Sequence, residues 1–361
     1  MILEKKLPVV QPIVDGYSHY GSVFSIIATN GTSYIPWFLS RFSQLYCQPA
    51  KNFFINMDEP NWFPDKTNFC PFLDVNLVDK GLINKMGSTI IDSIIELINN
   101  NYYLFMVVEQ KHIPGSYGFN KYSFPHDIMI YGYNLNREIL YIADNFSGKY
   151  QFSECSFTQF DLAYHTLDKA RDRLDSKICL LKNRSDRFEE FDLMRVVDSI
   201  YGYWKSSSPE QRSSNWSSAF DGCVKGIESY EVVKEYLNLL SKGEVKYDIR
   251  PFHSLWEHKK IMIMRLEYMQ RNGLLKTDHT ILNSYKNIEQ MSLILRNLIL
   301  KYNLTQDHSI LTRMSSEVDK IVFDEHKIIP AILNNIQNPE YKKDNKVFGL
   351  QMDHKLRWSL S

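Results

Sequence analysis

The segment from residue 124 to residue 150 constrains the fold most, because its pattern predicts two strands joined by a tight turn. Apolar and aromatic residues dominate residues 127–133 and 138–143, and an Asn-rich turn separates them. His126 stands at the outer start of the first predicted strand, and Asp144 at the outer end of the second. Because the two strands of an antiparallel hairpin run side by side, this order predicts an imidazole next to a carboxylate.

An imidazole oriented by a carboxylate is the base half of a nucleophilic triad. Ordinary polar ends of a hairpin would show the same two residues. Pro125 stiffens the approach to His126, and Asp144 lies in an Ala-Asp-Asn exit that is typical of an orienting carboxylate. These features favour the catalytic interpretation, which still requires a nucleophile from elsewhere in the chain.

The N-terminal region offers a hydroxyl nucleophile at the start of a helix. A turn at Asp15 and Gly16 precedes an apolar run that predicts a helix over residues 23–28, with Ser18 or Ser22 as the N-cap. Free backbone N–H groups and the helix dipole favour a nucleophile at such a position. A serine that only caps the helix is the alternative.

The rest of the pattern predicts an α+β domain followed by helices. Further helices are expected over residues 37–46 and 87–99, and further strands near 53–55 and over 102–108 and 177–182. Residues 60–75, rich in proline and aromatic residues, are expected to form a loop over the site. After Asn183 helical periodicity replaces the strand signals. We therefore expect an α+β domain with a central antiparallel sheet over residues 1–182, an all-helical domain over 183–340, and a loose charged tail over 341–361.

Composition excludes several classes of function. Lys plus Arg equals Asp plus Glu, 42 against 42, which argues against general nucleic-acid binding. No run of 18 apolar residues predicts a membrane span. The five cysteines are scattered without a CxxC motif, which argues against a zinc site and favours free thiols in the cytoplasm. His253 and Glu257 lie four residues apart on a predicted helix, a spacing compatible with a metal site, but a polar face or an inter-domain contact is the favoured interpretation.

Three features together resemble a known family. They are the short motif before the N-terminal helix, the HDIMIYGYN…LYIADN hairpin, and a helical half with the segment DIRPFHSLWEHK at residues 248–259. They resemble acyltransferases of the butirosin biosynthesis protein H type, in the papain-like cysteine hydrolase superfamily. The resemblance implies a papain-like N-terminal domain and transfer of an acyl, aminoacyl or peptidyl group from a carrier-protein thioester to an amine or hydroxyl acceptor in antibiotic biosynthesis. It implies no cofactor beyond the phosphopantetheine of an acyl or peptidyl carrier protein.

The resemblance assigns roles to individual residues. The His-Cys pair of the family falls on Tyr17 and Ser18, so Ser18 replaces the nucleophilic cysteine and acts with His126 and Asp144. Ser22 is an alternative nucleophile, and Gln11 is the candidate oxyanion donor. The same triad would serve a thioesterase, an amidase or a cyclase. Alternatively, the chain is a catalytically degenerate accessory that binds a carrier protein or a peptide.

Overall fold

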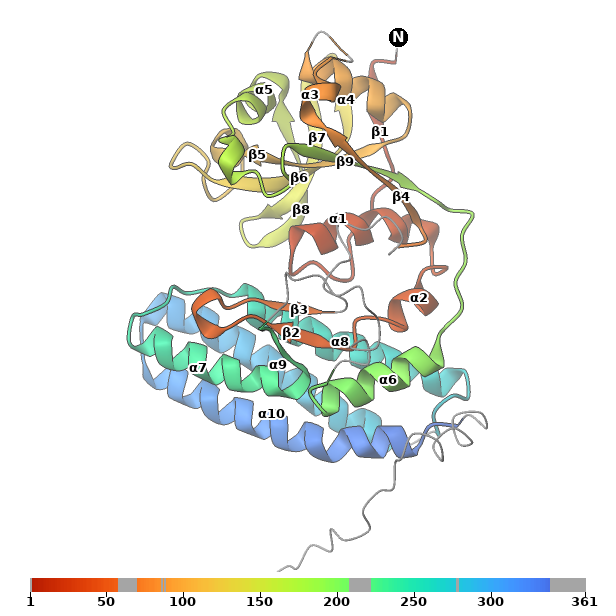
Figure 1. Ribbon diagram of the computed structural model, residues 1–361, viewed down its shortest axis with the longest axis vertical. Helices are drawn as coiled ribbons and strands as arrows, with labels where there is room; N and C mark the ends of the chain where they lie inside the picture. The colour runs from red at the N-terminus through yellow and green to blue at the C-terminus, as the bar shows by residue number, and fades with distance from the viewer. Residues whose placement is uncertain are drawn as a thin grey trace, which may run out of the picture.

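The computed structural model describes residues 2–57, 70–85, 87, 89–207, 222–276 and 279–337. It shows a mixed α/β protein in which a large antiparallel sheet with its helices, the sheet unit, is followed by a bundle of long helices, the helical unit (Figure 1). The expected order of a sheet followed by helices is thus confirmed at this level. Buried apolar side chains form one core cluster that extends through both units.

Among the described residues the large sheet has seven strands, all paired antiparallel, in the order β4-β9-β5-β6-β7-β8, with β1 paired to β6. The strands are β1 (Glu4–Lys6), β4 (Leu73–Asp79), β5 (Tyr103–Glu109), β6 (Pro125–Asn134), β7 (Ile139–Phe146), β8 (Lys149–Ser156) and β9 (Lys177–Asn183). The predicted hairpin is β6–β7, where Met129 pairs with Ala143 and Tyr133 with Leu140. It lies inside the sheet, so both of its strands have neighbours on either side.

Helices cover the sheet on both faces. They are α1 (Ser18–Ile27), α3 (Lys80–Ile83), α4 (Ile90–Asn99) and α5 (Phe157–His165). Figure 1 shows α4 and α5 on one side of the sheet and α1 on the side that faces the helical unit. A capping box at Thr89 and Asp92 starts α4, and its isoleucines are buried against the strands. Each such side chain contributes about 1.5–3 kcal/mol through the burial of apolar surface.

Helix α1 is longer than predicted and its cap differs. The expected helix covered residues 23–28 with a serine N-cap, but α1 begins at Ser18 and its N-cap is Tyr17, which makes no side-chain cap hydrogen bond. Both serine hydroxyls have other partners: that of Ser18 bonds to Asp127, and that of Ser22 accepts from Tyr150 at 3.1 Å. Tertiary hydrogen bonds therefore compete with local capping here.

The prediction for residues 37–46 was wrong. The helix α2 (Ile35–Leu39) is short, and residues near its expected end form the strand β2 (Leu45–Cys47). Phe42 has a φ of 57°, a left-handed conformation that stops a helix. The strand expected near 53–55 is β3 (Ile55–Met57). Of the expected loop at residues 60–75, residues 60–69 lie outside the described part, and its last three residues begin β4.

In the part of the chain that the structure describes, the helical unit contains five long helices and a small sheet. The helices are α6 (Leu193–Trp204), α7 (Ser229–Ser241), α8 (Arg250–Arg271), α9 (His279–Thr305) and α10 (Ser309–Asn334). The strand β10 (Val224–Lys225) pairs with β2, and β2 pairs with β3, to form a second antiparallel sheet. Among the helices that the structure describes, none is both long enough and apolar enough to cross a membrane.

The boundary between the two units in space differs from the boundary predicted along the chain. Strands β2 and β3 belong to the first 182 residues, yet they lie on the helical unit, against α7 and α8 (Figure 1). Helix α1 is tied to them, because Tyr17 donates to the carbonyl of Ile55 at 2.9 Å and Tyr20 donates to that of Met57 at 2.8 Å. The predicted boundary after residue 182 therefore describes the chain order and not the packing. The expected tail, residues 341–361, lies outside the described residues.

Candidate functional site

The hairpin brings His126 and Asp144 together. His126 is the second residue of β6, and its Nδ1 lies 2.9 Å from Oδ2 of Asp144 on β7. Asp144 is 1% exposed, while the His126 side chain is 22% exposed. A carboxylate on Nδ1 requires the proton there, which leaves the lone pair on Nε2. This is the tautomer that a general base needs.

The Asp144 carboxylate is held by two further donors. Gln110, which follows β5, donates its side-chain N–H to Oδ2 at 2.5 Å, and the backbone N–H of Asn145 donates to Oδ1 at 2.6 Å. The ring of Phe124 stacks on His126, with centroids 5.2 Å apart and planes at 10°. The imidazole is thus oriented by a carboxylate on one side and an aromatic ring on its face.

The Ser18 hydroxyl does not contact this pair. Ser18 is the first residue of α1, and its Oγ donates to Oδ2 of Asp127, the residue after His126. Among the described residues no hydrogen bond joins Ser18 to His126, so the expected proton path from serine to imidazole is not formed in this conformation. A buried carboxylate is a stronger acceptor than a neutral ring nitrogen, which explains the choice.

Asp127 nevertheless lies close to the pair. Its Oδ1 is 3.8 Å from Nδ1 of His126, and it forms an ion pair with Arg173. His19 follows Ser18 on α1. Burial, and then the positive charges of Arg173 and His126, lower the pKa of His19 to about 3. The first turn of α1 and the His126–Asp144 pair therefore share one electrostatic environment.

The other two candidates have different surroundings. The amide of Gln11, the expected oxyanion donor, donates to the carbonyl of Tyr150 at 3.4 Å. Ser22, the alternative nucleophile, is fully buried and accepts a hydrogen bond from the Tyr150 hydroxyl. Like the buried Ser18, neither residue lines the pocket that contains His126 and Asp144.

That pocket has a volume of about 420 Å³ and lies between the two units. His126 and Asp144 line it from the sheet unit, together with the aromatic residues Tyr117 and Tyr122. Its opposite wall comes from the helical unit, chiefly from the start of α8 and from Arg296 on α9. A ligand in this pocket would touch both units, as in many sites at domain interfaces.

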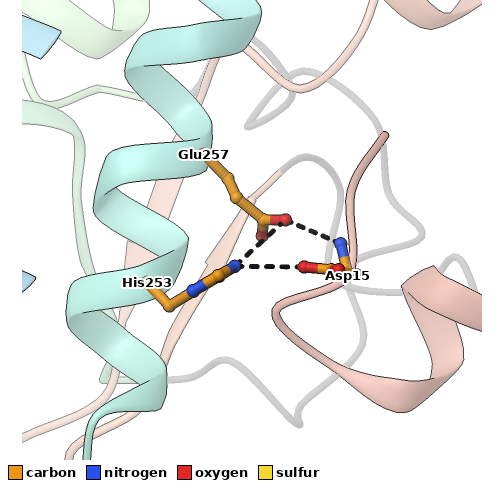
Figure 2. A group of neighbouring side chains, drawn as sticks. All are labelled: Asp15, His253 and Glu257. Carbon is orange, nitrogen blue, oxygen red and sulfur yellow. Dashed lines mark hydrogen bonds and ion pairs between the residues drawn. The ribbon is translucent and has the colours of Figure 1, made fainter. Parts of the chain in front are cut away.

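Three side chains join the units beside this pocket (Figure 2). Asp15, in the loop before α1, lies 3.2 Å from Nε2 of His253, and Glu257 lies 3.5 Å from the same atom. The Glu257 carboxylate also accepts the backbone N–H groups of Asp15 at 2.6 Å and of Gly16 at 3.1 Å. His253 and Glu257 face this loop from one side of α8, so the inter-domain contact favoured from their spacing is present.

The ligand atoms of Asp15, His253 and Glu257 are close enough together to hold a metal ion. Arg296 argues against it, since its Nε–H donates to Nδ1 of His253 at 3.0 Å and so leaves the ring proton on Nε2, the atom a metal would need. Burial lowers the pKa of His253, but the hydrogen bonds of Asp15 and Glu257 outweigh burial and raise it to about 9. The Arg296 hydrogen bond requires Nδ1 without a proton, so it favours the neutral ring. The carboxylates of Asp15 and Glu257 favour the charged ring, which carries a proton on both nitrogens. In either protonation state Nε2 of His253 carries a proton, so the donor set fits a hydrogen-bonded contact between the units better than a metal site.

Several residues of the site were not predicted. Gln110 donates to Asp144, and Asp127 accepts from Ser18. Asp15 and Arg296 are the hydrogen-bond partners of His253. Gln110 had a usable signal, because it directly follows a predicted buried strand next to the hairpin. The partners of Ser18 and His253 depend on how distant segments pack, which no local pattern encodes.

Comparison with known proteins adds no identity. No protein-family model matches the chain, and no curated protein sequence matches it.

Proposed function

We propose that the protein is an acyl-transfer enzyme that uses Ser18 as nucleophile and His126 with Asp144 as base. It takes an acyl, aminoacyl or peptidyl group from a carrier-protein thioester and passes it to an amine or hydroxyl acceptor. The supporting observation is the His126–Asp144 pair, which lines a pocket of about 420 Å³ with no described hydrogen bond on Nε2. The antiparallel sheet behind the pair and the hydrogen bond from the start of α1 to Asp127, next to His126, also support the proposal.

In the first step Ser18 Oγ attacks the thioester carbonyl carbon, and its proton passes to Nε2 of His126. This attack forms the C–O bond of the acyl-enzyme. The C–S bond then breaks, and His126 gives the proton to the departing thiolate. An acceptor amine or hydroxyl then attacks the ester carbonyl and gives its proton to His126. The C–O bond to Ser18 breaks, His126 returns the proton to Ser18 Oγ, and the acyl product leaves. Backbone N–H groups at the start of α1 are the candidate oxyanion donors.

This chemistry requires Ser18 to leave Asp127. Rotation about one side-chain bond would move the hydroxyl, and binding of a thioester would supply the free energy for that step. Hydrolysis would use the same residues with water as the acceptor, giving a thioesterase or amidase, and an internal acceptor would give a cyclase. Transfer would require that the acceptor, bound in the pocket between the two units, reaches the ester before water does.

A second function is favoured by one specific observation. The Ser18 proton is directed to Asp127 and away from His126. A binding protein that keeps the fold without the chemistry would tolerate that arrangement. We therefore carry a degenerate carrier-protein or peptide-binding accessory as the competing proposal. For either function we place the protein in the cytoplasm, in agreement with five unpaired cysteines.

The test is the intact mass of the protein after incubation with acyl thioesters, both carrier-bound and as small mimics. The wild type is expected to gain the mass of the acyl group, and Ser18→Ala and His126→Gln are expected not to. Ser22→Ala is the matched control, since it removes a serine hydroxyl from the same helix and should still be acylated. Asp127→Asn weakens the acceptor that holds Ser18 and should speed acylation.

An adduct that persists in Ser18→Ala would move the nucleophile elsewhere and contradict this proposal. Absence of any adduct, confirmed with a fluorophosphonate probe that labels activated serines, would favour the binding protein. The lifetime of the adduct with and without added amines separates a transferase from a hydrolase.

A further inference from the structure

The acidic and the basic side chains that line the pocket beside His126 differ in whether they have partners within the protein. Asp15, Asp144 and Asp248 line it, and each already has a partner within the protein. Asp144 binds His126 and Asp15 binds His253, at 2.9 and 3.2 Å. Asp248 forms an ion pair with Arg250 at 2.6 Å. Each of these carboxylates therefore has a hydrogen-bond or ion-pair partner within the protein before any ligand enters.

Arg296, in contrast, has no carboxylate partner among the described residues. Its Nε donates to His253 at 3.0 Å, and one terminal nitrogen donates to the Asn297 side chain at 3.3 Å. The guanidinium also lies 5.5 Å from the ring of Trp256. These contacts orient the side chain, which is half-buried, but none of them neutralises its charge. The remaining N–H groups are available to a ligand.

A second uncompensated cation lines the same pocket from the other unit. Lys149 is the first residue of β8, directly after the turn that follows β7, and it is exposed. It takes part in no ion pair in the described part of the chain. Arg296 and Lys149 thus present positive charge from the helical unit and from the sheet unit to one cavity.

The rim of the pocket is aromatic. Tyr117 and Tyr122 are each 53% exposed, although both are large side chains that line a cavity. Phe124 continues this surface to His126, on which it stacks. Large aromatic side chains left exposed at a cavity rim commonly contact a ligand body.

We propose that this pocket binds a ligand that carries a carboxylate or phosphate group, held by Arg296 with support from Lys149, while the body of the ligand lies along Tyr117 and Tyr122 towards His126. A guanidinium with a fixed orientation and unused donors suits either anion, because both accept paired hydrogen bonds. The inference rests on the proposed function only in treating this ligand as the substrate. Anion binding itself does not depend on catalysis.

The test is an NMR titration of the histidine ring signals of the full chain at constant ionic strength. The probes are inorganic phosphate, glutarate and, as a cationic control, ethanolamine. His253 reports on Arg296 because the two are hydrogen-bonded, and His126 reports on the reactive end. The signals are assigned with His253→Gln and His126→Gln. In the wild type, phosphate or glutarate is expected to shift the His253 signal saturably, and ethanolamine is not.

Arg296→Gln should weaken anion binding at least about tenfold, the loss expected for one hydrogen bond to a charged group. Arg296→Lys keeps the charge without the paired donors and should fall in between. Arg137→Gln, a control in the β6–β7 turn whose arginine pairs with Glu154 on the surface, should bind as the wild type does. Tighter binding of phosphate would indicate a phosphorylated ligand, and tighter binding of glutarate a carboxylic acid.

The inference is overturned if neither anion shifts the His253 signal, or if Arg296→Gln and Arg296→Lys bind as tightly as the wild type. The acyl-adduct assay on the wild type and Ser18→Ala, run beside this titration, distinguishes failure of this inference from failure of the proposed function. Anion binding that is retained without any acyl adduct in the wild type rejects only the catalytic proposal. An adduct without anion binding rejects only this one.

Discussion

Two clusters, each built around a basic and an acidic side chain, differ in whether they lie at a pocket or are fully buried. The His126–Asp144 pair lies at a pocket, and His126 keeps one nitrogen without a described partner. In the helical unit, Lys259 of α8 and Glu325 of α10 are 2.8 Å apart and both 0% exposed. The hydroxyls of Tyr203 and Tyr285 donate to the same Glu325 carboxylate at 2.5 and 2.9 Å.

The comparison shows that unused hydrogen-bonding capacity, more than charge, distinguishes a candidate site from a structural network. Lys259 donates to Glu325, to Tyr203 and to the ring of His258, so its three N–H groups are all occupied. A buried group in that situation can fasten helices together but has nothing left for a ligand. His126 and Arg296 retain donors or acceptors that face a cavity.

The largest effect on stability is expected at the buried network. Lys259→Met leaves the Glu325 carboxylate buried without its counter-charge, and should lower the free energy of unfolding by about 3–5 kcal/mol. Urea denaturation measures this change. The double variant Lys259→Met with Glu325→Met removes both charges and should recover much of the loss. A single variant as stable as the wild type would show that the network does not hold the helices.

The contact between the units should be next in size. A methyl group at Gly16 would lie 2.6 Å from Oε2 of Glu257 and would displace the carboxylate from the backbone of this loop. We expect Gly16→Ala to lower the free energy of unfolding by about 1–3 kcal/mol. Glu257→Gln keeps the shape and removes the charge, and should cost less. Equal stability of Gly16→Ala and the wild type would mean that the contact adjusts freely.

The pH dependence of stability should reveal His258. Its Nε2 donates to the carbonyl of Ser43 at 2.9 Å, and burial, then the charge of Lys259, hold its pKa well below the usual 6.5. The ring therefore stays neutral in the folded protein, whereas the unfolded chain takes up a proton below about pH 6.5. Stability should be complete above that pH and fall below it, by at most about 1.4 kcal/mol per pH unit from this residue.

Urea denaturation between about pH 7.5 and 4.5 tests this sign. His258→Gln should show a flatter dependence than the wild type over that range. His19, whose pKa is also lowered, contributes with the same sign and remains in both proteins, so the difference between the two curves belongs to His258. If stability depends on pH as steeply in His258→Gln as in the wild type, another residue takes up the proton.

The smallest effect on stability is expected at the candidate site itself. His126 is partly exposed and its Nε2 makes no described contact, so His126→Gln should change the free energy of unfolding by less than about 1 kcal/mol. The same variant should lose acylation by thioesters. A large loss of stability would make His126 a structural residue like those of the buried network, and the comparison would fail.

Local patterns predicted much of the fold and one half of the site. The isoleucine periodicity of α4 and the apolar runs of β5 and β9 repeat over successive residues, so each element could be recognised in isolation. The His126–Asp144 pair was predictable for the same reason, because a single hairpin contains both residues. The strand β4 was missed, since its burial alternates weakly and it follows a segment rich in proline.

By itself the sequence determined the periodic elements and the hairpin, because their hydrogen bonds and apolar faces depend on residues only a few positions apart. Only the tertiary structure decided which groups those elements offer to each other. Ser18 bonds to a residue 109 positions away, and Asp15 to one 238 positions away. Such pairs form through the packing of whole units, where a buried carboxylate can outcompete an imidazole for a serine proton. That competition leaves no periodic signal in the chain.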